Sequence, residues 1–147
     1  MRDETRRAVR RWIPAIVWTA LIFIVSSIPT LPSVGFRLAF ADKIAHAIEF
    51  AGLGLFLTIG FGGADGERGR RQTALLVIAS GLTIGFLDEL YQLAVPGRRV
   101  EFLDWVADSV GVVAGYGAAV AYSARRRTRG RTAGGTAASS DDDGVRI

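Results

Sequence analysis

The sequence contains no cysteine among its 147 residues, and it contains one histidine, His46. The lack of cysteine excludes a disulfide framework, a thiol nucleophile and a thiolate metal site. Charge is also scarce, because only 22% of the residues are charged while half are hydrophobic. That balance is too apolar for an ordinary small soluble domain. The length is typical of a single compact unit.

The basic residues outnumber the acidic ones, 18 to 14, which raises the question of nucleic-acid binding. The arginines flank hydrophobic runs, however, and do not alternate with aromatic residues on a soluble face. Arginine beside an apolar run is better explained by membrane topology. We therefore expect membrane lipids as partners and no nucleic acid.

Four long apolar runs organise the chain. They cover approximately residues 12–28, 44–63, 73–93 and 103–122. Runs of this length are typical of membrane helices, and the first is too long for a signal-peptide core and lacks a cleavage site after it. The sequence predicts an all-α integral membrane bundle of four transmembrane helices over 12–122. A basic N-terminus (1–11) precedes it and a basic, then acidic, disordered tail (123–147) follows. Two prolines and a glycine leave the conformation of 29–41 open.

The distribution of basic residues predicts which way the bundle is oriented. Five precede the first run, three lie between the second and third runs, and six follow the fourth, so 14 of the 18 lie on one side. The positive-inside rule places that side, with both termini, in the cytoplasm. The expected localisation is the cell membrane, as a multi-pass protein.

The charge-free segments are short for a bilayer. Residues 50–64, 72–87 and 109–124 reach about 22–24 Å as helices, whereas a hydrocarbon core is about 30 Å thick. Their cytoplasmic ends are closed by arginine or polar loops. Each helix must therefore extend into acidic residues at its outer end, where ionisable groups indicate a functional site by default.

Helical spacing brings these polar residues onto inward faces. Asp42, His46 and Glu49 share one face, and an imidazole among carboxylates suits proton transfer. The candidate catalytic residues are His46, Asp42, Glu49, Asp88 and Glu89. The alternative is a buried neutral histidine that is hydrogen-bonded to Asp42 or Glu49.

The last run carries acids and small residues on the same face. Asp104 and Asp108 are in register with Gly111 and Gly115. The two glycines form a small-xxx-small pattern, which lets membrane helices pack closely. We therefore expect the acids to point into the bundle.

A divalent cation is the candidate cofactor of this acidic end. The candidate metal ligands are Asp88, Glu89, Asp104 and Asp108. Their oxygens favour Mg²⁺ or Ca²⁺, and Zn²⁺ if His46 joins them. The candidate ligand-binding residues are Lys43, Gln92, Arg98, Asp104 and Asp108. Arg98 follows a Pro-Gly turn, where a guanidinium suits a phosphate or carboxylate. The alternative is an internal ion-pair network with Lys43, Arg98 and Arg99.

Three motifs in this order resemble the VanZ-like family of small polytopic membrane proteins. They are Asp42-Lys43-x-x-His46-x-x-Glu49-Phe50, Asp88-Glu89-x-x-Gln92-x-x-x-Pro96-Gly97-Arg98 and Asp104-x-x-x-Asp108-x-x-Gly111-x-x-x-Gly115. The resemblance covers about residues 12–122. The family pattern usually has tyrosine where this chain has Phe50 and asparagine where it has Asp108. The resemblance implies a membrane protein associated, in some members, with resistance to teicoplanin, and it implies no particular reaction.

Two functions from different classes follow from these residues. One is an enzyme that acts on an amphiphile of the outer leaflet, such as a lipid-linked cell-envelope precursor. The other is a non-catalytic membrane protein that binds a lipid or glycopeptide-type ligand, or whose charge cluster is structural. A proton-coupled transporter is disfavoured, because polar groups at one end of four helices offer no path across the membrane.

Overall fold

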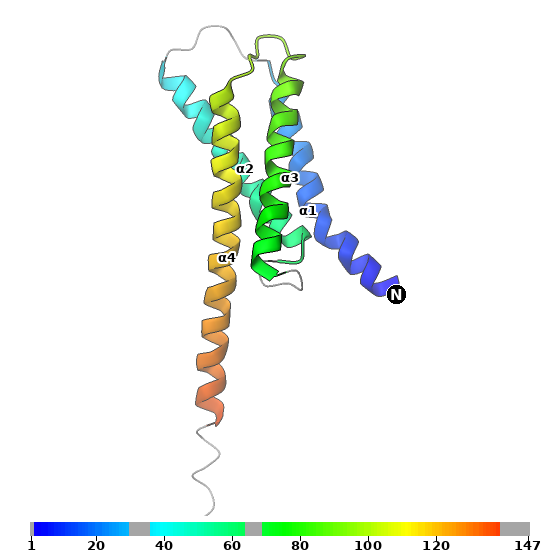
Figure 1. Ribbon diagram of the computed structural model, residues 1–147, viewed down its shortest axis with the longest axis vertical. Coiled ribbons are helices and arrows are strands. Elements are labelled where there is room, and N and C mark those ends of the chain that lie inside the picture. Colours follow the sequence, from blue (N-terminus) through cyan, green and yellow to red (C-terminus); the bar gives the residue numbers. More distant parts are fainter. Residues whose placement is uncertain (1, 30–35, 64–68, 139–147) are drawn as a thin grey trace, which may run out of the picture.

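The structure is a computed structural model that describes residues 2–29, 36–63 and 69–138. Four helices make up nearly all of these residues: α1 (Arg2–Ser26), α2 (Phe36–Gly60), α3 (Gly69–Gln92) and α4 (Phe102–Ala138). Successive helices run in opposite directions, so α1 begins and α4 ends at the same end of the bundle (Figure 1). No strand occurs within the described ranges, and the predicted all-α class is confirmed.

Three of the four helices are long and apolar enough to cross a membrane. They are Asp3–Ser26, Ala41–Gly60 and Gly69–Gln92. At about 1.5 Å per residue these lengths match the roughly 30 Å of a hydrocarbon core. Helix α4 is longer, but aspartates and glycines dilute its apolar part, and it is not among the three. The membrane character predicted for the chain is therefore carried by α1, α2 and α3.

The helices begin earlier than the apolar runs that predict them. Helix α1 already includes the basic residues from Arg2 onward, and α2 begins at Phe36 rather than near Ile44. Residues 36–41, the last part of the segment whose conformation the sequence left open, are therefore helical and form the beginning of α2. Residues 30–35, which belong to the same segment, lie outside the described residues.

Helix α4 ends later than expected. It continues to Ala138, so residues 123–138 are helical where the sequence predicts a disordered tail. Arginine accounts for five of residues 123–131, and arginine has a high intrinsic helix propensity. Residues 139–147, the rest of the predicted tail, lie outside the described part of the chain.

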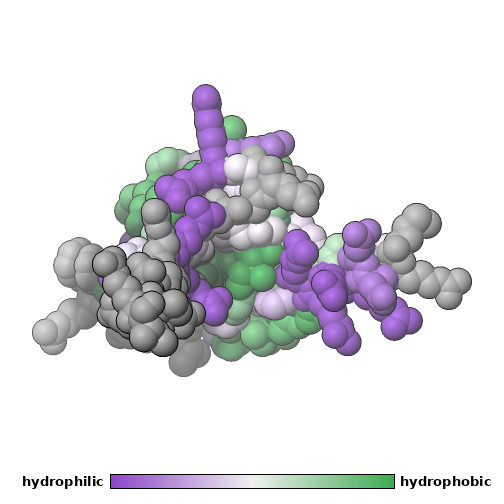
Figure 2. All heavy atoms as spheres, turned by 90° about the horizontal axis from the view of Figure 1, so that it is seen from below, coloured by the Kyte–Doolittle hydropathy of each residue, from purple (hydrophilic) through white to green (hydrophobic). Residues whose placement is uncertain are grey.

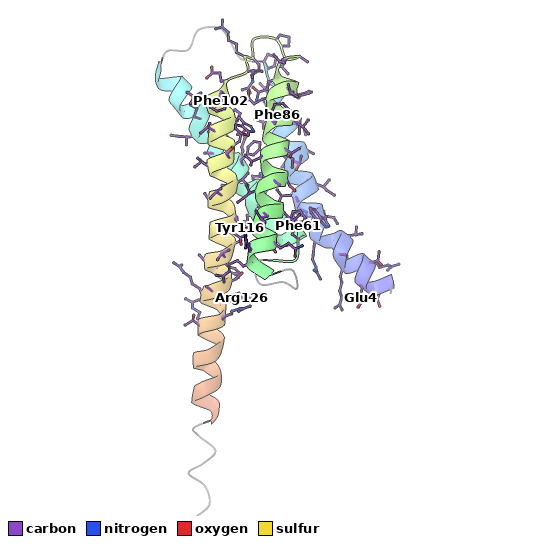
Figure 3. The ribbon with its side chains drawn as sticks, viewed as in Figure 1. Glu4, Phe61, Phe86, Phe102, Tyr116 and Arg126 are labelled. Carbon is purple, nitrogen blue, oxygen red and sulfur yellow. The ribbon has the colours of Figure 1, made fainter. Side chains whose placement is uncertain are left out.

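The bundle is apolar both inside and outside. Its core consists of Ala15, Ile22, Phe50, Leu53, Leu57, Val77 and Val112. Large aliphatic side chains on every helix, such as Ile16, Ile48, Leu75 and Val110, are also at least 60% exposed. A helix that is hydrophobic on all sides is characteristic of a membrane span. Aromatic residues lie at several levels of the bundle, with Phe86 and Phe102 towards one end (Figure 3).

Glycines bring α4 into backbone contact with α2, and these two helices share the largest interface in the bundle. A Cβ atom added at Gly111 would collide with the carbonyl of Ala47, and one added at Gly115 would collide with the carbonyl of Ala51. The packing role predicted for this small-xxx-small pattern is confirmed. The same contact brings the first turns of α4 against α2.

The two ends of the bundle carry different polar groups. The end at which α1 begins and α4 ends carries exposed arginines, and hydrophilic side chains project from it around hydrophobic surface (Figure 2). The opposite end contains the buried polar residues Ser26, His46, Asp88, Glu89, Gln92, Asp104 and Asp108. The predicted convergence of the acids on one end of the bundle is therefore confirmed.

Candidate functional site

The candidate site is formed where the connection between α3 and α4 folds over the ends of α1 and α2. The regular part of α3 ends at Gln92, and a turn with Gly97 at φ 83° reverses the chain. The amide of Asp104 donates to the carbonyl of Glu101 as α4 begins, 2.9 Å away. Asp104 lies in the first turn of α4, where the helix dipole favours a negative charge. The chain thus returns its second group of acids to the level of the first.

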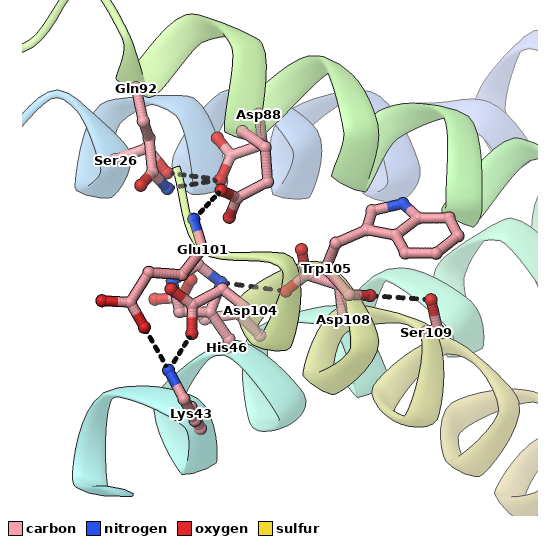
Figure 4. Close-up of polar contacts among 12 residues, drawn as sticks. Ser26, Lys43, His46, Asp88, Gln92, Glu101, Asp104, Trp105, Asp108 and Ser109 are labelled. Atoms are coloured by element: carbon pink, nitrogen blue, oxygen red, sulfur yellow. Dashed lines mark hydrogen bonds and ion pairs between the residues drawn. The ribbon is translucent and has the colours of Figure 1, made fainter. Parts of the chain in front are cut away.

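His46 and Asp108 form a buried pair between α2 and α4. The His46 Nδ1 atom lies 2.9 Å from Asp108 Oδ1, and the two residues are only 6% and 1% exposed (Figure 4). The second carboxylate oxygen, Asp108 Oδ2, is buried without a hydrogen-bond partner among the described residues. Gly85 of α3 leaves room for it, since a Cβ there would stand 3.1 Å from this oxygen. His46 therefore pairs across helices, and not with Asp42 or Glu49 of its own helix as the alternative interpretation predicts.

Asp88 is held by hydrogen bonds from α1 and from its own helix. Its Oδ2 atom accepts from the Ser26 hydroxyl at 2.9 Å and from the Gln92 amide at 3.0 Å (Figure 4). Asp88 is fully buried, and its Oδ1 atom has no partner in the described part of the structure. Asp88 and Gln92 lie one helical turn apart on α3, a spacing at which side chains can contact each other.

Glu89 faces the connection that follows α3. Its Oε2 atom accepts the backbone N–H of Glu101 at 3.1 Å. Glu89 is 4% exposed, and Oε1 is buried without a partner within the described ranges. The three carboxylates of Asp88, Glu89 and Asp108 are therefore alike. In each, one oxygen has a hydrogen-bond partner and the other has none among the described residues.

Lys43 forms ion pairs with one exposed acid and one buried acid. Its ammonium lies 2.8 Å from Glu101 and 2.7 Å from Asp104 (Figure 4). The Asp104 side chain is 4% exposed, whereas that of Glu101 is 51% exposed. The Lys43 part of the predicted ion-pair network is therefore present. The buried carboxylates of Asp88, Glu89 and Asp108 have other partners.

An open polar cavity of about 120 Å³ lies beside these groups. It is lined by Asp42, Gln92, Gly97, Arg98, Arg99, Glu101 and Asp104. The Arg98 Nε atom donates to the carbonyl of Ile28 at 3.3 Å, which ties the α3–α4 connection to the end of α1. Two guanidinium groups and three carboxylates thus surround one small space.

Most of the residues predicted for the site meet around this cavity or directly beneath it. Glu49 lies one turn further along α2 and is half-buried, and its backbone carbonyl accepts the Trp18 indole N–H at 2.7 Å. Three other residues of the site were missed by the sequence reasoning: Ser26, Glu101 and Trp105, whose indole donates to the Leu82 carbonyl at 3.1 Å. No sequence signal distinguished Ser26, because Thr19 and Ser27 are hydroxyl residues of the same apolar run.

Two groups of side chains have the spacing to hold a metal ion. Ligand atoms of His46, Glu89 and Asp108 lie within 4.8 Å of one another, and all three residues are buried. The same holds for Asp42, His46 and Asp104, of which Asp42 is exposed. Three of the four oxygen ligands predicted from the sequence, Glu89, Asp104 and Asp108, are thus divided between two groups that share His46. Asp88 belongs to neither.

A family model described as VanZ/LLP1 matches residues 5–123. No curated protein and no solved structure matches the chain. The matched range includes every residue that lines the cavity. It also includes the buried carboxylate layer beside the cavity, which consists of Asp88, Glu89 and Asp108.

Proposed function

The chain belongs to the VanZ/LLP1 family, and from that premise we propose that it binds the anionic headgroup of an amphiphilic cell-envelope ligand at the polar end of its bundle. The ligand class is a lipid-linked envelope precursor or a glycopeptide-type amphiphile. The observation that carries the proposal is the open cavity with Arg98 and Arg99 in its wall. Arginine is the side chain best suited to recognise phosphate or carboxylate, because its planar fork donates two parallel hydrogen bonds.

The proposal includes the orientation of the bundle. All four helices cross the membrane, both termini are cytoplasmic, and the cavity faces outward. Three apolar spans and the alternating helix directions support this arrangement. The backbone contact of α4 with α2 supports a fourth crossing, because a helix packed along a membrane span occupies the same depth. The basic residues at the opposite end support its orientation.

Apolar surface beside the cavity supports a ligand with a lipid tail. Three large hydrophobic residues are adjacent in sequence to residues that line the cavity, and their exposed fractions are 58–71%. They are Leu93, Phe102 and Leu103. Such residues at the end of a membrane bundle offer a surface to acyl or prenyl chains. A headgroup in the cavity and a tail in the bilayer are thus compatible with one bound molecule.

Binding of a polyprenyl phosphate to the purified chain tests the proposal. The measurement is native mass spectrometry in mild detergent, with the corresponding polyprenyl alcohol as the matched ligand control. We expect the phosphate to bind and the alcohol to bind much more weakly. Arg99→Gln removes a charge-assisted hydrogen bond worth about 1.5–3 kcal/mol, so we expect about 10- to 100-fold weaker binding.

Arg71→Gln is the control variant, since Arg71 is an exposed arginine of α3 at the opposite end of the bundle. It should bind the phosphate like the wild type. Equal binding of phosphate and alcohol would contradict headgroup recognition. Equal weakening in the Arg71 and Arg99 variants would show that general positive charge, and not the cavity, attracts the ligand.

Acid–base chemistry on the bound ligand is the second candidate function. The buried His46–Asp108 pair favours it, because a carboxylate that orients an imidazole is the usual arrangement of a general base. His46→Gln would then abolish turnover of the ligand and leave its binding intact. If the ion pairs are purely structural, the same variant lowers the yield of folded protein instead.

A further inference from the structure

We infer that His46, Glu89 and Asp108 form a binding site for a divalent transition-metal ion, with Zn²⁺ as the ion that fits best. The site lies at the inner side of the cavity, between α2, α3 and α4. The inference deepens the proposed function, and it rests on that function for the role of the ion but not for its binding.

The buried carboxylate layer and its neighbours contain more acidic than basic side chains. Asp104 is paired with Lys43 and Asp108 with His46, whereas Asp88 and Glu89 form no ion pair among the described residues. The carboxylates of Asp88, Glu89 and Asp108 are at most 4% exposed. Burial of an unpaired charge is expensive, so buried carboxylates are usually paired or coordinate a metal. One divalent cation would supply the missing positive charge.

Unpartnered oxygen atoms point to the same conclusion independently. Glu89 Oε1 and Asp108 Oδ2 are buried and have no hydrogen-bond partner among the described residues. Buried polar atoms are satisfied in the great majority of cases, and an exception calls for a further partner such as an ion. Both oxygens belong to residues of the His46, Glu89 and Asp108 group.

The spacing of the ligand atoms fits a metal ion after a small rearrangement of the side chains. One ligand atom from each residue lies within 4.8 Å of the other two, and the His46 Nδ1 atom lies 2.9 Å from Asp108 Oδ1. Two tetrahedral ligands of Zn²⁺ at about 2.0–2.1 Å stand about 3.3 Å apart. One nitrogen and two oxygens form a ligand set suited to Zn²⁺ more than to Mg²⁺ or Ca²⁺. Three protein ligands leave the fourth position open.

The group that contains Asp42 and Asp104 is the weaker alternative. Asp42 is exposed, and Asp104 already contacts the Lys43 ammonium at 2.7 Å. A cation there would compete with a lysine that is fixed in place. Among the described residues, no lysine or arginine forms an ion pair with His46, Glu89 or Asp108, so a cation at this group would not compete with a fixed basic side chain.

Contacts from the cavity wall reach this group directly. Glu101, which lines the cavity, donates its backbone N–H to Glu89, and cavity-lining Asp104 lies within 4.8 Å of His46 through their ligand atoms. An ion held beneath the cavity would add positive charge to a space that already contains two arginines. Its open position would then receive a phosphate or carboxylate oxygen of the bound headgroup.

Metal titration of the full chain tests this inference. The protein is purified in mild detergent, treated with a chelator, and titrated with ZnCl₂ by calorimetry, and elemental analysis gives the stoichiometry. We expect one Zn²⁺ per chain. Changes of outer-shell partners weaken metal sites by 10- to 100-fold, so loss of a direct ligand in Glu89→Gln or Asp108→Asn should weaken binding by at least about 100-fold.

Two control variants separate this site from its neighbours. Asp42→Asn disrupts only the alternative group, and Asp88→Asn removes a buried acid that belongs to neither group. Both should retain tight Zn²⁺ binding. A wild-type protein that binds no Zn²⁺ at one equivalent would overturn the inference, and so would loss of binding in the Asp42 variant. If a ligand variant does not fold, Co²⁺ titration of the wild type decides, since tetrahedral Co²⁺ with nitrogen and oxygen ligands gives visible absorption and an empty site gives none.

These outcomes are distinguishable from failure of the proposed function, because the metal titration contains no lipid. Zn²⁺ binding without binding of polyprenyl phosphate would leave the metal site standing and contradict the headgroup proposal. Binding of the phosphate by a chain that takes up no metal would do the reverse.

Discussion

Substitution of Gly111 by alanine should disturb the candidate site, because the added methyl group changes how α4 packs against α2. A Cβ at Gly111 would stand 3.0 Å from the Ala47 carbonyl carbon and 3.0 Å from the Ala51 nitrogen. Non-bonded carbons prefer about 3.5–4.0 Å, so Gly111→Ala must move α4 away from α2 by about 0.5–1 Å. Overpacking of this kind typically costs about 1–3 kcal/mol.

The displacement also strains the pair one turn away. His46 and Asp108 lie on the two helices that Gly111→Ala separates, and their 2.9 Å contact would lengthen to about 3.4–3.9 Å, beyond normal hydrogen-bond range. A hydrogen bond to a charged group contributes about 1.5–3 kcal/mol. With partial loss of that bond, we expect Gly111→Ala to lower the free energy of unfolding by about 2–4 kcal/mol in total.

Two measurements on the same sample check this expectation. Unfolding in mixed detergent micelles gives the free energy, and the imidazole ¹⁵N shifts report the His46 hydrogen bond without ambiguity, since the chain has one histidine. Gly117→Ala is the matched control on the same helix, because nothing lies within 4 Å of its added Cβ. The control should be unchanged, or more stable by up to about 1 kcal/mol from helix propensity. Equal stability of the two variants, with unchanged His46 shifts in the Gly111 variant, would refute the reasoning.

Two further predictions concern the partners of the buried acids. Ser26→Ala removes one of the two hydrogen bonds to Asp88 and should cost about 1.5–3 kcal/mol of unfolding free energy, whereas Ser27→Ala, at the exposed neighbour, should cost less than about 1 kcal/mol. Equal losses in the two serine variants would contradict the assigned contacts. Lys43→Met leaves Asp104 buried without its cation and should cost about 2–3 kcal/mol, less than the 3–5 kcal/mol typical of a fully buried pair, because the lysine side chain is 22% exposed. Adding Asp104→Asn to that variant should recover most of the loss, and a double variant as unstable as the single one would show that the ion pair is not the cause.

The sequence predicts the scaffold of the site well, because the scaffold depends on two properties of single helices. These are the periodicity of apolar residues and the free-energy cost of placing a charge in a membrane. The four apolar runs locate the helices, and the expense of charge in a membrane places the acids at one inward-facing end. Gly111 and Gly115 predict a close contact of this helix with a neighbour, which the structure shows to be α2, since only small residues let two helix backbones meet. These inferences use residues that are neighbours on one helix.

The partners across helices could not be predicted in the same way. Spacing on α2 offers Asp42 and Glu49 to His46, but the structure pairs His46 with Asp108, 62 residues away. Asp88 likewise bonds to Ser26 from a helix that carries no acid near its end. Such pairs depend on the relative height and rotation of packed helices, which the side-chain pattern of each helix leaves undetermined.

The extent of the helices also exceeded the apolar pattern. Hydropathy locates only the part of a helix that lies in lipid, whereas α1 and α4 continue through their basic ends, where intrinsic propensity and solvent-exposed arginines sustain the helix. The same limit affects α4, whose glycines and aspartates weaken its apolar signal although they are the residues that pack it against α2 and form the site.

The membrane sidedness of two engineered cysteines tests the central claim most directly. The chain has no cysteine of its own, so Pro96→Cys in the α3–α4 connection and Arg125→Cys in α4, both at exposed positions, are each the single reactive thiol. With four crossings and an outward-facing cavity, a membrane-impermeant maleimide labels the Pro96 variant in intact cells and labels the Arg125 variant only after permeabilisation. Labelling of both variants in intact cells, or of the Arg125 variant alone, would contradict the account, because the cavity and the end of α4 would then not lie outside and inside the membrane as proposed.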